Sequence, residues 1–181
     1  MTLQIMKTIS FLGRSRMLEK DYMNVTMHGW NRLIEIYGNQ LTYLTLQDCD
    51  IDDQQLQIIV EGFRRLKYLD VSSNRIGDAT ALKQICEGIE VLKVGPRLIG
   101  NNVSADIPIE SILAGHGRFV SELYLQGFLH SNLSLVSQMH NLTKLTIRFM
   151  KPLFEDLNMA NCFAAIGRIN TLRCLEIYQV N

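Results

Sequence analysis

The sequence predicts an α/β solenoid in which short parallel strands form one curved sheet and the connecting helices cover its outer side. A pattern of spaced leucines recurs down the chain, and helical periodicity follows each of the clearer copies. Successive copies begin 22 to 31 residues apart. Periods of roughly 20–50 residues are typical of repeat architectures. Each unit can bury its apolar stripe only against its neighbours, so the copies should stack.

Two copies of the pattern are clear. Residues 41–51 and 66–76 both follow the spacing Leu-x-x-Leu-x-Leu/Val-x-x-Cys/Asn-x-Ile, and they begin 25 residues apart. Four more degenerate copies begin at Ile89, Val120, Leu142 and Leu172. This spacing defines a leucine-rich repeat. We therefore expect a leucine-rich-repeat solenoid of about five to six repeats, with the parallel sheet on the concave face and the helices on the convex face.

The first clear copy is followed by a good helix signal. Asp52 or Asp53 can accept hydrogen bonds from the first free backbone amides of a helix and so cap it. Apolar residues then recur at i, i+3, i+4 and i+7, which indicates one buried helical stripe. They are Leu56, Ile59, Val60 and Phe63.

Later repeats carry weaker helix signals. In the second repeat Asp78 offers the cap, and the inward-facing residues are Leu82, Ile85, Cys86 and Ile89. Further inward faces are expected at Ile109, Ile112 and Leu113, at Leu135, Val136 and Met139, and at Ala160, Phe163 and Ala164. The sequence thus predicts a helix after each strand.

Two regions make up the predicted organisation. Residues 41–181 form the repeat domain, with an insertion near residues 95–108. Residues 1–40 form an N-terminal helical cap, because residues 17–37 carry apolar side chains at helical spacing and terminal repeats need a cover. Those side chains are Trp30, Leu33, Ile34 and Tyr37.

Composition excludes several classes of partner. The formal net charge is zero, so no global field attracts nucleic acid or anionic lipid. No apolar run approaches the ~20 residues that span a bilayer. The mildly apolar start is interrupted by Lys7 and has no convincing cleavage site for a signal peptide. We therefore expect a cytoplasmic or nuclear protein that binds neither nucleic acid nor membranes.

No pattern in the chain indicates catalysis, a cofactor or a metal. The four cysteines are widely spaced, and the four histidines have no partner at metal-ligand spacing. Neither a nucleophile elbow nor a phosphate-binding glycine loop is present. An enzymatic alternative would have to use Asp70, Lys93 and Glu122, which suit recognition better. We expect a protein that is not an enzyme.

The repeat pattern also predicts which side chains form the concave face. Strand side chains alternate between the two faces of a sheet, so residues between the buried leucines point away from the core. Four of the six tyrosines fall on such positions. Tyrosine is favoured at protein interfaces, but it also suits exposed strand positions. The predicted partner-binding residues are Tyr43, Gln47, Tyr68, Asp70, Lys93, Glu122, Tyr124, Lys144, Arg148, Glu176 and Tyr178.

The two clear copies resemble the cysteine-containing repeats of F-box/leucine-rich-repeat proteins. The matching residues are Cys49, Ile51 and Asp52 in one copy, and Asn74, Ile76 and Asp78 in the next. The resemblance implies a substrate-recognition subunit of a cullin-RING ubiquitin ligase, in which an F-box binds the Skp adaptor and the repeats bind the substrate. Residues 1–40 would then be a possible F-box remnant.

The alternative is a stand-alone leucine-rich-repeat protein with a regulatory or inhibitory role, because many unrelated interaction proteins share the repeat pattern. Residues 172–180 predict a final strand with no helix after it. An unpaired strand edge is a template for pairing with another chain, so self-association through this edge is also expected.

Overall fold

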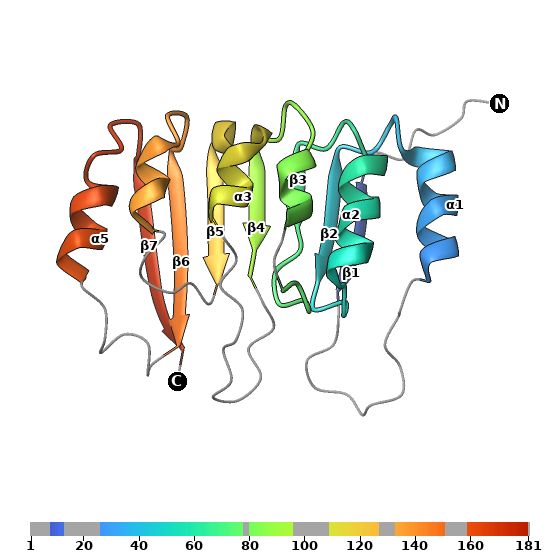
Figure 1. Cartoon of the computed structure of the whole chain (residues 1–181), viewed down its shortest axis with the longest axis horizontal. Helices are drawn as coiled ribbons and strands as arrows, with labels where there is room; N and C mark the ends of the chain where they lie inside the picture. Colours follow the sequence, from blue (N-terminus) through green and yellow to red (C-terminus); the bar gives the residue numbers. More distant parts are fainter. Residues whose placement is uncertain are drawn as a thin grey trace.

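The computed structural model describes residues 8–12, 26–77, 80–95, 109–126, 133–150 and 159–180. Over these ranges seven strands form a single open sheet, all parallel and in sequence order (Figure 1). The strands are β1 (Thr8–Leu12), β2 (Tyr43–Gln47), β3 (Tyr68–Asp70), β4 (Val91–Val94), β5 (Glu122–Gln126), β6 (Lys144–Met150) and β7 (Cys174–Val180). The predicted α/β class with one parallel sheet is confirmed.

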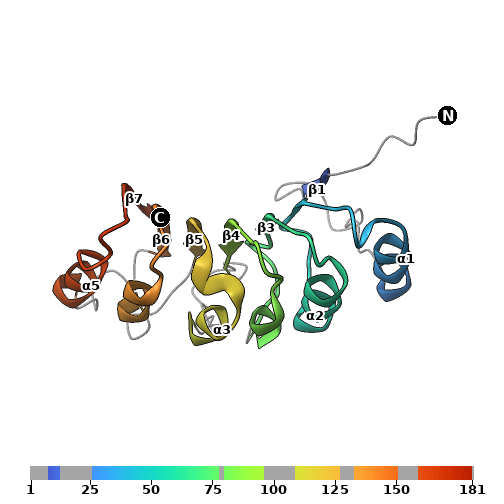
Figure 2. The same cartoon turned by 90° about the horizontal axis from the view of Figure 1, so that it is seen from above.

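Helices cover one side of this sheet. Figure 2 shows the strands as a shallow arc with the helices along its outer side, so the uncovered side of the sheet is the concave face. The α-helices are α1 (Met27–Tyr37), α2 (Asp53–Gly62), α3 (Ile109–Ala114) and α5 (Met159–Ile166). The 3-10 helices are η1 (Thr80–Gln84), η2 (His116–Phe119) and η3 (Leu133–Gln138).

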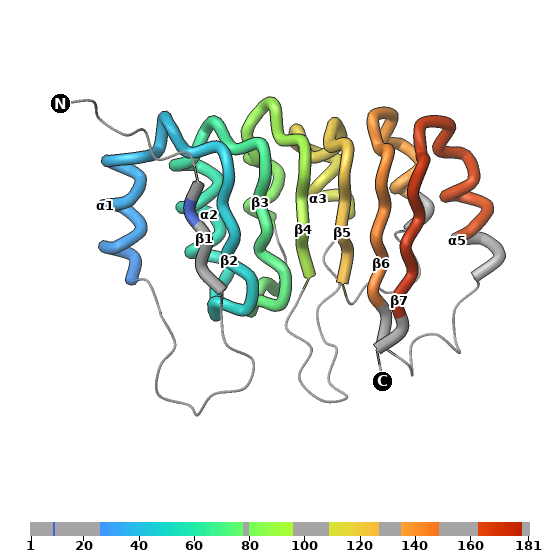
Figure 3. Tube along the Cα trace, turned by 180° about the vertical axis from the view of Figure 1, so that it is seen from behind, coloured from blue at the N-terminus to red at the C-terminus, as the bar shows by residue number. Residues whose placement is uncertain are grey.

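The core lies between the sheet and the helices. In the tube view the strands run side by side in front of the helices (Figure 3). Corresponding leucines are in register on adjacent strands, and each is at most 1% exposed. They are Leu44, Leu69, Leu92, Leu123 and Leu145. Burying one leucine side chain contributes about 1.5–3 kcal/mol, so the recurrent pattern supplies the main stabilisation of the sheet.

The expected cap of the first helix is present at the start of α2. The Asp52 side chain accepts a hydrogen bond from the Gln55 amide at 2.8 Å, and the Gln55 side chain accepts one from the Asp52 amide at 3.1 Å. This reciprocal arrangement is a capping box. Leu56, Ile59 and Val60 lie on the buried face of the helix, as the periodicity predicts.

Asn74 links the two clear copies of the sequence pattern. Its Oδ1 accepts hydrogen bonds from the backbone amides of Cys49 at 2.9 Å and Ile51 at 3.0 Å. Its Nδ2 donates to the carbonyls of Leu46 at 2.7 Å and Val71 at 2.9 Å. Asn74 is completely buried. The asparagine position of the pattern therefore fixes the turns that follow β2 and β3.

Two helical segments differ from expectation in type. The structure has the 3-10 helices η1 and η3 where the sequence predicts α-helices. A 3-10 helix rises about 2.0 Å per residue rather than 1.5 Å, so a short connection covers the sheet with fewer residues. Leu82 and Ile85 are buried as predicted. The predicted cap, Asp78, lies outside the described residues.

Helix α5 is rotated relative to the prediction. Phe163 is 44% exposed and Ala164 is also exposed, although both were expected to face inward. Ala165, Ile166 and Ile169 are buried instead. The prediction was wrong because Ile166 and Ile169 form the larger apolar pair, and packing this pair against the core sets the rotation of the helix.

The N-terminal region contains a strand where a helical cap was expected. Strand β1 pairs in parallel with β2, with Thr8 opposite Tyr43. Helix α1 lies within the predicted helix, and Thr26 caps it by accepting a hydrogen bond from the Gly29 amide at 3.2 Å. Trp30 is fully buried, as its spacing predicts. The expected insertion lies outside the described residues, except for Gly95.

Candidate protein-binding surface

The predicted partner-binding residues lie on the concave face in rows that cross the strands. The register aligns a first row of Tyr43, Tyr68, Val91, Glu122, Lys144 and Cys174. It aligns a second row of Thr45, Asp70, Lys93, Tyr124, Thr146 and Glu176. A third row contains Gln126, Arg148 and Tyr178. Residues far apart in the sequence thus form one continuous surface.

Two stacked tyrosines dominate one end of this surface. The rings of Tyr43 and Tyr68 lie 4.0 Å apart between centroids, with an interplanar angle of 12°. The Lys93 ammonium lies 5.3 Å from the Tyr68 ring centroid, within the range of a cation–π contact. Burial, a hydrogen bond with Tyr43 and the charge of Asp70 raise the pKa of Tyr68, in that order. The Tyr68 hydroxyl is therefore neutral, and Tyr43 and Lys93 hold its ring in place.

Asp70 lies beneath the surface rather than on it. The residue is only 4% exposed, so a partner has little access to it. One carboxylate oxygen accepts hydrogen bonds from the Ser72 amide at 3.1 Å and the Ser72 hydroxyl at 2.6 Å. The other lies 3.8 Å from the Lys93 ammonium. Asp70 consequently orients Lys93 and the end of β3.

The other end of the concave face contains a hollow of about 260 Å³. Its lining residues come from β4 to β7 and are Val91, Lys93, Glu122, Leu123, Tyr124, Lys144, Thr146, Glu176 and Tyr178. Six of these were predicted as partner-binding residues from the sequence. The hollow therefore brings tyrosines and charges of both signs into one place.

An ion pair closes one side of this hollow. The Lys144 ammonium lies 2.9 Å from a Glu176 oxygen, and the Thr146 hydroxyl donates to the other Glu176 oxygen at 3.0 Å. The hydrogen bonds from Lys144 and Thr146 lower the pKa of Glu176. The hydrogen bond to Glu176 raises the pKa of Lys144. Both groups remain charged at neutral pH.

A hydrogen-bond chain from β5 to the turn after β3 holds Tyr124. Its hydroxyl donates to Gln126 Oε1 at 2.9 Å, and Gln126 Nε2 donates to the Ser73 hydroxyl at 3.0 Å. Gln126 reaches Ser73 past Gly95, where an added Cβ would lie only 2.3 Å from the Gln126 Cβ. The sequence did not predict this series of hydrogen bonds, because Ser73 and Gln126 are 53 residues apart and the repeated pattern contains no feature that relates the two positions.

The remaining predicted residues are more open. Gln47 and Glu122 are exposed, Arg148 is half-buried, and Tyr178 is 51% exposed. Within the described ranges neither Glu122 nor Arg148 forms an ion pair. These side chains are available to a partner on the concave face.

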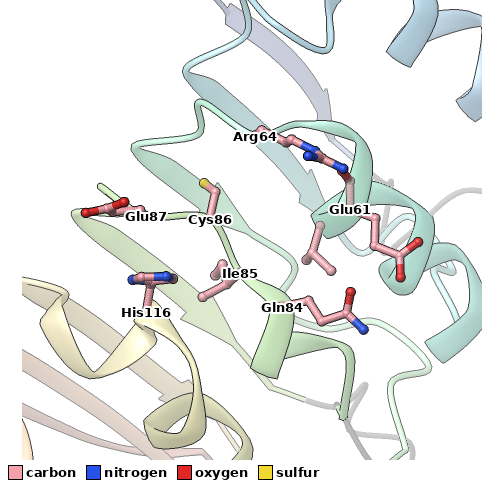
Figure 4. A pocket seen from close by; sticks show the side chains of 8 residues that line it. Glu61, Arg64, Gln84, Ile85, Cys86, Glu87 and His116 are labelled. Atoms are coloured by element: carbon pink, nitrogen blue, oxygen red, sulfur yellow. The ribbon is translucent and has the colours of Figure 1, made fainter.

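A second hollow, of about 330 Å³, lies on the helical side. Glu61 and Arg64 line one side of it and Glu87 and His116 the other, with Cys86 between them (Figure 4). Burial raises the pKa of the Cys86 thiol, which donates to the Leu66 carbonyl at 3.2 Å. In the part of the chain that the structure describes, no three His, Cys, Asp or Glu side chains are placed to hold a metal ion.

Comparison with known proteins assigns no family to the chain. No protein-family model matches it, and no curated protein matches it. Among the described helices, none has the length and apolar character needed to cross a membrane. The fold and the surface define an α/β protein with an open parallel sheet whose uncovered face carries tyrosines and charges.

Proposed function

We propose that this chain is a leucine-rich-repeat solenoid that binds another protein on its concave face. The observation that carries the proposal is the alignment of tyrosines and charged residues in cross-strand rows on the sheet face that none of the described helices covers. Tyrosine supplies a large rigid contact area with a polar end and is enriched at the energetic centres of interfaces.

Repetition of the local geometry supports the solenoid. Successive strands pair in parallel with the pattern leucines in register. Asn74 of one repeat holds the turn of the preceding repeat through Cys49 and Ile51. Contacts between neighbouring units of this kind are what stabilise repeat proteins.

A purely structural role for the tyrosines is the main alternative. Cross-strand aromatic pairs stabilise sheets, and the stack of Tyr43 on Tyr68 fits that role. Tyr178 does not, because it is 51% exposed on the concave face. An exposed tyrosine beside a hollow lined by charges favours binding over sheet stability alone.

Two forms of the function remain as proposals. The first is a substrate-recognition subunit of a cullin-RING ubiquitin ligase, which the resemblance of the repeats to F-box/leucine-rich-repeat proteins suggests. The second is a stand-alone regulatory or inhibitory binding protein. An F-box is helical, whereas Thr8–Leu12 extends the sheet as β1, and this observation favours the second form.

Site-specific photo-crosslinking tests binding on the concave face. Benzoylphenylalanine would replace Tyr178 on this face or, as a matched control, Phe119 in the helical layer. The two side chains are equally accessible, at 51% and 49% exposure. We expect a discrete protein adduct in cell extract from position 178 and none from position 119. Equal adducts from both positions, or none from position 178, would contradict the proposal.

The same adducts separate the two forms. Recovery of the Skp adaptor and a cullin with the tagged chain, independent of the crosslinker's position, would support the ligase subunit. A position-178 adduct without either protein would support the stand-alone form. The Tyr68→Ala/Tyr124→Ala variant should lose the adduct in both cases, because it removes ring area from the first and second rows.

A further inference from the structure

The charges on the concave face are not all equally available to a partner. Lys93 is held by Asp70 at 3.8 Å, and Lys144 is held by Glu176 at 2.9 Å. Both lysines already have a counter-charge within the protein. A partner's acidic group would have to compete with these contacts, so neither lysine is the best anchor for an anion.

Glu122 and Arg148 are different. Glu122 is exposed, and Lys144, its register neighbour, is directed to Glu176 instead. Arg148 lies in the third row between Gln126 and Tyr178, which are both uncharged. Across the described ranges, these two side chains form no ion pair. One negative and one positive charge on the surface thus have no ion-pair partner among the described residues, although the charge of Glu122 still acts on Lys144.

The register fixes the spacing between these two charges. Arg148 pairs with Gln126, which lies four residues after Glu122 along β5. Strands rise about 3.3 Å per residue and lie about 4.8 Å apart, so the two backbone positions are separated by about 14 Å, mostly along the strand direction. Four residues of an extended partner segment cover almost the same length.

We propose that the partner places an extended segment along the strands, with a basic residue at Glu122 and an acidic residue four positions away at Arg148. This inference rests on the proposed binding function of the concave face. Tyr124 and Tyr178 lie beside this path and would contact the residues between the two charges.

The hollow explains why the basic residue belongs at Glu122. It is bounded there by Val91 and Tyr124, which offer apolar surface next to the Glu122 carboxylate. Lysine and arginine pack their aliphatic stems on such surface while the charged group stays at the rim. A short acidic side chain would leave this surface unfilled.

Selection from a random peptide library tests the inference. A displayed library of 12-residue peptides would be selected on the immobilised wild-type chain and on the Glu122→Lys and Arg148→Glu variants. Glu110→Lys on α3 and Arg65→Glu before β3 are matched controls, since both residues are exposed and lie outside the concave face. Thermal unfolding of each variant would verify that it folds.

We expect wild-type peptides to be enriched in a basic and an acidic residue four positions apart. Selection on Glu122→Lys should lose the basic residue alone, and selection on Arg148→Glu should lose the acidic residue alone. Both controls should select the wild-type pattern. For one enriched peptide, each reversal should weaken binding about tenfold, and reversing the matching peptide charge should restore it.

The outcomes separate this inference from the proposed function. Peptides that depend on Tyr68 and Tyr124 but show no charge pattern would overturn the inference and leave the binding function intact. Peptides that bind equally to the Tyr68→Ala/Tyr124→Ala variant would overturn both. Enrichment of acidic residues alone, lost in a Lys93→Gln/Lys144→Gln variant, would show that the paired lysines are the anchors and would also refute the inference.

Discussion

Replacing Asn74 by alanine should destabilise this protein more than any surface substitution. The side chain forms four short hydrogen bonds to buried backbone groups, two as acceptor and two as donor, at 2.7–3.0 Å. Each such bond contributes about 1 kcal/mol net, and stranded buried groups add their own desolvation cost. We therefore expect a loss of about 3–5 kcal/mol in the free energy of unfolding. Domains are commonly stable by only ~5–15 kcal/mol.

Urea unfolding followed by circular dichroism measures this loss. Asn39→Ala is the matched control, because Asn39 is exposed in the turn after α1 and should change the free energy of unfolding by less than about 0.5 kcal/mol. A loss below about 1 kcal/mol for Asn74→Ala would refute the reasoning. Water or neighbouring groups would then replace the side chain at the amides of Cys49 and Ile51.

Three further predictions follow from single contacts. Gly95→Ala should cost about 1–3 kcal/mol in urea unfolding, because the added Cβ would lie 2.3 Å from that of Gln126. The Glu176 carboxylate should titrate below the ordinary pKa of 4.5, and Lys144→Met should raise its midpoint in carbon-detected NMR. Cys86 should be alkylated by iodoacetamide at pH 8 more slowly than a fully exposed cysteine thiol, because burial raises the pKa of Cys86.

Controls for these predictions use the same chain. At Gly167 the nearest atom to an added Cβ is 3.2 Å away, so Gly167→Ala should cost much less than the change at Gly95. For the alkylation, Cys86→Ser identifies the slow site. Equal losses of stability at Gly95 and Gly167 would contradict the packing argument. Equal alkylation rates for Cys49, Cys86 and Cys174, in the folded chain as in the unfolded chain, would contradict the burial argument.

The pH dependence of the ion pair has a definite sign. The folded pKa of Glu176 is lowered, so its contribution to stability is present above pH 4.5 and is lost as the pH falls through the folded value. The folded pKa of Lys144 is raised, so its contribution is present below pH 10.5 and is lost as the pH rises through the folded value. A Glu176→Gln variant should remove the first dependence and weaken the second, because the charge of Glu122 also raises the pKa of Lys144.

Much of the surface was predictable because it follows from strand alternation. Once the leucines fix the buried side of each strand, residues such as Tyr43, Tyr68 and Tyr124 must face the other way. Their alignment across the sheet then follows if each copy of the pattern forms one strand and adjacent strands pair in parallel. Which of these residues remain accessible was not predictable, since no pattern in the chain indicates that Asp70 is buried beneath Lys93.

Errors in the prediction come from segments where periodicity is weak. Phe163 and Ala164 were expected inside, but Ile166 and Ile169 decide the rotation of α5. Residues 80–84 were expected as an α-helix, yet a short connection adopts the tighter 3-10 form. In both places several local arrangements satisfy the pattern, and packing against the neighbouring segments of the core selects one.

The leucine spacing within each copy of the pattern is enough to specify which side chains of a strand are buried, whereas the Asn74 side chain acts on the amides of Cys49 and Ile51 in the preceding copy. Tertiary structure alone decided the pairing of charges and the chain from Tyr124 through Gln126 to Ser73. The ion pairs join adjacent strands, and the hydrogen bond from Gln126 to Ser73 joins β5 to the turn after β3. Their geometry depends on how closely adjacent segments of the sheet approach, as at Gly95, and no local pattern encodes that distance.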